Sequence, residues 1–128
     1  MSRRRVVVTG LGIVSPVGNN IKTAWENILA GNSGIGPVTR FDVADFPVRF
    51  AGEIRDFDVS EYIPGKDARR MGAFIHYGIA AACQAIADSG IEITAANASR
   101  AGVAIGSGIG GLHGIENTFQ TYLQSGPR

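Results

Sequence analysis

The sequence predicts an α/β fold, because segments with helical periodicity alternate with short, almost wholly apolar segments. The two apolar segments are residues 5–11 and 102–105. Neither alternates polar with apolar side chains, a pattern typical of parallel strands covered on both faces. A weaker strand signal lies at residues 48–54. The expected order is therefore strand, helix, weak strand, helix, strand, helix.

The first predicted helix covers residues 20–30, where apolar side chains recur at helical spacing. Either Asn19 or Asn20 is expected to cap its first turn, because a side-chain oxygen there accepts a free backbone N–H. Gly31 follows its last residue, where a left-handed conformation commonly ends a helix.

Two further helices are predicted at residues 67–88 and 112–124. The longer one carries an apolar face and is expected to end at Gly90. The other is expected to stop at Gly126, which a proline follows.

The chain of 128 residues is long enough for one domain. Two covered strands are nevertheless too few for a stable parallel sheet. We therefore expect residues 1–128 to be the first part of a larger domain. Residues 33–66 carry weak signals, and such a long irregular stretch is expected to pack against another part of the protein or a partner subunit.

Composition excludes several classes of protein. The formal net charge of +1 gives no general reason to expect nucleic-acid binding. No apolar run reaches the roughly 20 residues that span a bilayer, so no membrane segment is expected. Thr9 and Gly10 interrupt the valines that follow the N-terminal arginines, so no secretory signal is expected either. The single cysteine, Cys83, excludes an internal disulfide and a cysteine-based metal cluster. A cytoplasmic protein without a metal is the expectation.

A glycine-rich turn precedes the third predicted helix. Gly106, Gly108 and Gly111 match the G-x-G-x-x-G pattern that binds dinucleotides at a helix N-terminus. That pattern also needs an acidic residue about 20 positions later, and the sequence has none after Glu116. The simpler interpretation is a tight strand-to-helix turn that binds no phosphate.

Seven short motifs follow one another along the chain. They are Arg-Val-Val-Val-Thr-Gly-Leu-Gly (5–12), Ser-Pro-Val-Gly (15–18), Leu-Ala-Gly-Asn-Ser-Gly-Ile (29–35), Phe-Ala-Gly (50–52), Ala-Phe-Ile-His-Tyr-Gly (73–78), Asp-Ser-Gly (88–90) and Gly-Ser-Gly-Ile-Gly-Gly-Leu (106–112). In this order the chain resembles β-ketoacyl-[acyl-carrier-protein] synthases of the elongating, type II kind. The resemblance implies a layered, thiolase-like fold in a homodimer, of which this chain would be the first part of the N-terminal half.

The resemblance also implies a chemistry that needs no cofactor. A cysteine thiolate takes an acyl group from a carrier protein, and a malonyl-carrier loses CO2 to give the carbanion that attacks the thioester, assisted by two histidines and a lysine. The family's Thr-Ala-Cys nucleophile motif is absent here. Cys83 lies inside a predicted helix and is interpreted as a small buried hydrophobe. His76 and His113 lack the family's histidine contexts. We therefore expect no catalytic residue in this chain, which alone would be inactive. A non-catalytic scaffold or carrier-docking module is the alternative.

Lys66, Arg69 and Arg70 are spaced i, i+3 and i+4 across the start of the second predicted helix. Cations there oppose the helix dipole, a cost that Asp67 and an anionic partner would offset. The resemblance places residues that dock the acidic acyl carrier protein at these positions. The alternative is a solvated charged turn.

The resemblance assigns Ile109 to the border of the acyl pocket, where it gates entry of the acyl chain. Glycines flank Ile109 on both sides and leave its backbone free to move. The alternative is an ordinary core contact.

Overall fold

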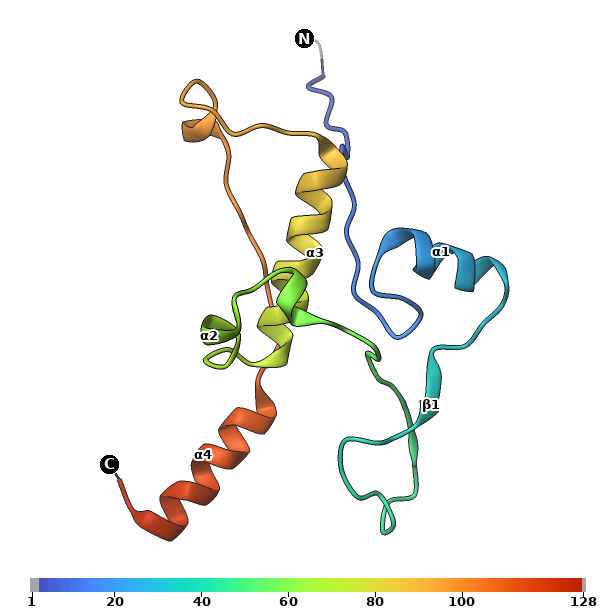
Figure 1. Ribbon diagram of the computed structural model, residues 1–128, viewed down its shortest axis with the longest axis vertical. Helices are drawn as coiled ribbons and strands as arrows, with labels where there is room; N and C mark the ends of the chain where they lie inside the picture. Colours follow the sequence, from blue (N-terminus) through green and yellow to red (C-terminus); the bar gives the residue numbers. More distant parts are fainter. Residues whose placement is uncertain (1–2, 128) are drawn as a thin grey trace. The chain divides into compact units, whose positions relative to one another are not determined.

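A computed structural model describes residues 3–127 (Figure 1). The expected domain, 1–128, also includes Met1, Ser2 and Arg128, which lie outside the described residues. The chain divides into two units, each described by itself below. Among the described residues, unit 1 comprises 3–58 and 80–92, and unit 2 comprises 59–79 and 93–127.

Unit 1 contains the first predicted helix, α1 (Ile21–Leu29). The Asn20 side chain accepts a hydrogen bond from the Thr23 amide at 2.9 Å, which satisfies one of the free N–H groups of the first turn. Gly31, with φ of 70°, adopts the left-handed conformation just after the helix. The predicted helix and both of its end signals are confirmed.

A two-stranded antiparallel hairpin follows in unit 1, formed by β1 (Ile35–Pro37) and β2 (Phe50–Gly52). The weak strand signal at residues 48–54 is thereby confirmed. Strand β1 was not expected, because glycine and proline make up two of its three residues and normally indicate a turn. The pairing places Ile35 opposite Gly52.

The Glu53 carboxylate, next to β2, closes this hairpin. It accepts hydrogen bonds from the Thr39 hydroxyl at 2.7 Å, the Thr39 amide at 3.0 Å and the Arg40 amide at 3.3 Å. These bonds, the Thr39 hydroxyl bond foremost, hold the pKa of Glu53 below its ordinary value of 4.5. Part of the irregular stretch is thus ordered by its own contacts.

Helix α3 (Ala73–Ser89) begins in unit 2 and continues into unit 1. In Figure 1 the extended N-terminal segment runs alongside its later turns. The Leu11 amide donates to the Asp88 carboxylate at 2.8 Å, and the Ile13 amide donates to the Gln84 side chain at 3.2 Å. A Cβ at Gly12 would overlap the carbonyl group of Ala81, so only glycine permits this close approach.

The two strands predicted at residues 5–11 and 102–105 are not formed within residues 3–127. A strand requires backbone hydrogen bonds to a neighbour, and in the described part of the chain only β1 and β2 pair as a sheet. The apolar side chains expected to be covered are instead exposed: Val6 is 89% and Val103 is 79% accessible. The prediction of covered parallel strands is therefore wrong for this structure.

The second predicted helix is also divided. A single turn, α2 (Gly65–Ala68), is followed by a non-helical turn and then by α3. Gly72 lies in the break, where glycine's low helix propensity favours interruption. The prediction of one helix over 67–88 is therefore wrong at its start, whereas its end at Gly90, with φ of 62°, is confirmed.

Unit 2 has a small core under α2. The side chains of Ile63 and Ala68 are buried, 4% and 7% accessible, between α2 and the short helix η1 (Val59–Glu61). A second short helix, η2 (Ala98–Arg100), precedes the apolar segment that leads to α4. Helix α4 (Leu112–Ser125) ends at Gly126, as predicted, with φ of 74°.

Candidate functional site

Lys66, Arg69 and Arg70 form a basic turn at the surface of unit 2. Lys66 lies in α2, Arg69 caps its C-terminal end, and Arg70 lies in the turn that follows. All three residues are exposed, whereas Ala68 between them is buried and anchors the turn. The structure therefore presents these three charges to solvent from a turn whose Ala68 side chain is buried.

The break between α2 and α3 changes the electrostatics of the basic turn. The sequence placed the three cations at the N-terminus of a long helix, where they would oppose its dipole. In the structure Arg69 ends α2 instead, and cations at a helix C-terminus are favoured. Arg70 also lies three residues before the first residue of α3, so the dipole cost and its offset by an anionic partner stay predictions.

A hydrogen bond of His76, in α3, links that helix to the basic turn. Nothing in the sequence indicated this contact. Its Nε2 atom lies 2.9 Å from the Ala68 carbonyl oxygen. A carbonyl oxygen only accepts, so Nε2 carries the proton and donates it. His76 is part-buried and links the turn to α3 through this hydrogen bond.

Ile109 lies in the glycine-rich turn of residues 106–111 and is 76% exposed. Within residues 3–127 its side chain is not part of a core. After it, Gly110 and Gly111 both have positive φ, 30° and 72°. The turn leads into α4 with Gly111 as its N-cap.

The basic turn and the glycine-rich turn are neighbours within unit 2. A Cβ at Gly72, two residues after Arg70, would lie 4.0 Å from the Gly111 Cα atom. The Phe74 ring lies against both glycines. The two groups of residues singled out from the sequence are thus brought to one region, which sequence spacing did not indicate.

The only cysteine, Cys83, is exposed and lies well inside α3. Its interpretation as a buried hydrophobe is therefore wrong. A position inside a helix lacks the free N–H groups of a helix N-terminus, which activate thiolates. His113 Nε2 accepts a hydrogen bond from the Asn117 side chain at 3.0 Å on α4.

No cluster of three or more histidine, cysteine, aspartate or glutamate side chains suited to a metal is found among residues 3–127. Nor does any helix in that range have the length and apolar character to cross a membrane.

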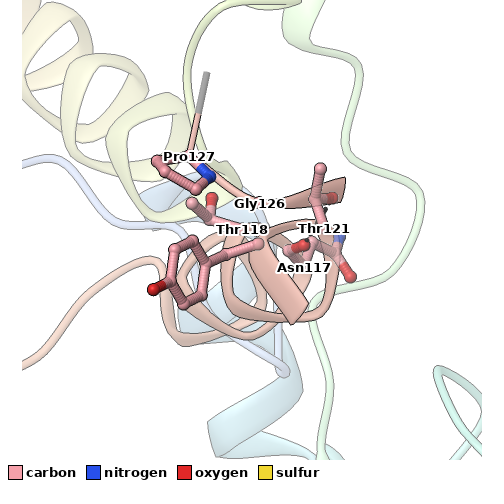
Figure 2. Close-up of a pocket in the computed structure, with 6 residues that line it drawn as sticks. Asn117, Thr118, Thr121, Gly126 and Pro127 are labelled. Atoms are coloured by element: carbon pink, nitrogen blue, oxygen red, sulfur yellow. Dashed lines mark hydrogen bonds between the residues drawn. The ribbon is translucent and has the colours of Figure 1, made fainter. Parts of the chain in front are cut away.

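A surface pocket of about 450 Å³ lies along the C-terminal turns of α4 (Figure 2). Its lining is polar side chains of α4 together with the residues that end the helix: Asn117, Thr118, Thr121, Tyr122, Gly126 and Pro127. None of the residues predicted to bind a carrier or an acyl chain lines it.

Comparison with protein families matches residues 3–126 to the β-ketoacyl synthase N-terminal domain. The chain is 56% identical over 128 residues to 3-oxoacyl-[acyl-carrier-protein] synthase 2 of Vibrio harveyi, and 55% identical to the protein of that name from Vibrio cholerae. A cyanobacterial protein of the same name, from Synechocystis, is 44% identical over 127 residues.

A solved structure, the ishigamide ketosynthase/chain length factor, superposes with a TM-score of 0.76 and 32% identity. The match covers 98% of this chain and 31% of that one. The chain likewise spans about 31% of the length of the two Vibrio relatives. These matches confirm the α/β, thiolase-like fold class that the resemblance implied. The chain belongs to the β-ketoacyl synthase family, in which residues 3–126 correspond to the N-terminal domain.

Proposed function

We propose that residues 1–128 are the N-terminal part of a 3-oxoacyl-[acyl-carrier-protein] synthase that elongates fatty acids. The observation that carries this proposal is the match of the whole chain, at 55–56% identity, to two relatives of that name. The resemblance to the ketosynthase/chain length factor is weaker, at 32% identity, which favours the fatty acid enzyme over a polyketide relative.

The proposed reaction has two halves. The enzyme thiolate attacks the acyl thioester and expels the carrier thiol, so the acyl group becomes bound to the enzyme. Malonyl-carrier then loses CO2, and the electron pair left on carbon attacks the acyl thioester and expels the enzyme thiolate. Cys83 lies inside a helix and the sequence holds no Thr-Ala-Cys motif, which supports a nucleophile and assisting bases outside residues 1–128.

What this chain contributes is binding. Lys66, Arg69 and Arg70 dock an acidic acyl carrier protein, a role supported by their exposure on a turn with a buried anchor. The family resemblance supports a homodimer as the working form. The single cysteine of this chain fits a reducing compartment, which supports the cytoplasm.

Ile109 gates entry of the acyl chain. Its exposed side chain and the glycines beside it support this role, because a gate must be reachable and able to move. In the full-length enzyme, Ile109→Phe should reduce activity on long acyl primers and spare short ones. An equal effect on both primers would exclude the gate.

The decisive experiment supplies the purified full-length enzyme with malonyl-carrier and an acyl-carrier primer. We expect a 3-oxoacyl-carrier product and one CO2 per condensation. Mass spectrometry of the native polypeptide accompanies the assay and is expected to show a chain much longer than 128 residues. A native chain of this length that binds carrier without releasing CO2 would instead establish a docking module.

A further inference from the structure

The aromatic ring of Phe74, in the first turn of α3, contacts glycines from two segments. A Cβ added at Gly110 would lie 2.6 Å from two ring carbons, and one at Gly111 would lie 2.9 Å from the ring. A Cβ at Gly72 would lie 3.0 Å from the same ring carbon, Cε1, that is nearest to Gly111. All four residues belong to unit 2.

These distances show that the ring lies in direct contact with the backbone of the glycine-rich turn. Real Cβ atoms are not found below 3.0 Å, so Gly110 and Gly111 leave space that the ring fills. Their positive φ values, 30° and 72°, independently require glycine. The path of this backbone is therefore matched to the shape of the Phe74 side chain.

Ile109 immediately precedes the two glycines held by the ring, and its own side chain is 76% exposed. The position of Ile109 is consequently set through its backbone rather than through contacts of its side chain. Phe74 is only 39% exposed and supplies the aromatic surface on which that backbone lies.

We propose that Phe74 is a positioning residue that holds the glycine-rich turn and so sets how readily Ile109 moves to admit long acyl chains. The proposal rests on the function proposed above and adds a determinant of chain-length selectivity outside the turn itself. The ring contacts Gly110 along one edge and Gly111 along the other, whereas a smaller aliphatic side chain leaves a gap and loosens the turn.

The test uses the full-length enzyme and compares kcat/KM for a long and a short acyl-carrier primer. Phe74→Leu should raise the long-to-short ratio about threefold or more, because the gate opens more easily. Phe74→Tyr keeps the ring and should keep the wild-type ratio. Phe46→Leu makes the same exchange in the hairpin loop of unit 1 and should leave the ratio unchanged.

A general structural effect of Phe74→Leu would lower kcat/KM for the long and the short primer together. A positioning effect changes their ratio and acts through Ile109. The change caused by Phe74→Leu should therefore disappear when Ile109→Ala is already present. Should Phe74→Leu fail to fold, as a thermal melt would reveal, Phe74→Met takes its place with the same expected direction.

The outcomes separate the two proposals. If the wild-type enzyme condenses primers but Phe74 variants keep its ratio, or change it equally in the Ile109→Ala background, the positioning role is refuted and the synthase stands. If the wild-type enzyme gives neither 3-oxoacyl product nor CO2, the proposed function fails and this inference fails with it.

Discussion

Reversing the charge of the basic turn is the sharpest test of carrier docking. Arg69→Glu combined with Arg70→Glu changes the net charge by four units without touching the buried Ala68 that anchors the turn. Both arginines are exposed, so their interactions with a carrier are those of charges in water. The double variant should bind an acyl carrier protein more weakly and more so at low salt.

The size of the effect follows from Coulomb's law. At a separation of about 7 Å in water, two unit charges interact by about 0.6 kcal/mol, which screening at 0.15 M ionic strength reduces to about 0.25 kcal/mol. Each arginine-to-glutamate change alters the charge by two units. With one opposing charge per residue, the double variant loses about 1 kcal/mol, roughly fivefold in Kd. At 0.01 M the loss rises to about 1.9 kcal/mol, roughly 20-fold.

The assay is titration of the full-length enzyme with acyl-carrier protein at both ionic strengths. The matched control is Lys22→Glu with Arg100→Glu, which makes the same change in net charge at exposed positions in α1 and η2. The control should bind nearly as wild type. Equal weakening in both double variants would indicate a general charge effect, and an unchanged Kd at 0.01 M would refute docking at the basic turn.

Three further predictions concern the structure around these sites. Thr39→Val removes the hydrogen bond that most lowers the pKa of Glu53, so that pKa should rise toward 4.5; an NMR titration of the carboxylate checks this. Because the folded-state pKa is depressed, Glu53 stabilises the hairpin above pH 4.5 and this stabilisation is lost as pH falls through the lowered pKa. Gly12→Ala forces a Cβ into the Ala81 carbonyl and should destabilise the protein by about 1–3 kcal/mol or more, measured by denaturant unfolding, and a wild-type midpoint would contradict the packing. Cys83→Ala should leave condensation at the wild-type rate in the full-length enzyme, and loss of the acyl-enzyme on mass spectrometry would show that Cys83 is the nucleophile after all.

Local signals in the sequence predicted local structure well. The ends of α1 and α4 were found because capping and left-handed residues act within one helical turn, as Asn20, Gly31 and Gly126 do. The break before α3 was missed because apolar periodicity continues across residues 69–72, which form a turn between the two helices. Strand prediction failed at residues 5–11 because apolar character shows only that a segment can be covered.

The candidate site could be predicted only in part. Lys66, Arg69, Arg70 and Ile109 were proposed from spacing and resemblance, which report residue types along the chain, and their roles stay predictions. The contact of Phe74 with the glycine-rich turn joins segments more than 30 residues apart, and no pattern within either segment encodes it. The glycines of the turn indicated that another part of the chain approaches their backbone closely. They did not indicate that the approaching side chain is Phe74.

The exposed valines of the extended N-terminal segment have a consequence for biosynthesis. The second apolar segment, residues 102–105, is made about 97 residues later than the first, residues 5–11. At about 5–20 residues per second it leaves the ribosome roughly 5 to 20 s after the first. Val6 to Val8, 69–89% accessible even when residues 3–127 have all folded, must therefore wait in water for whatever covers them. An apolar extended segment with unpaired backbone groups is a template for association with other chains. We expect this chain, made alone, to depend on chaperones or low temperature for its yield, and a high yield of monomer at 37 °C would contradict that dependence.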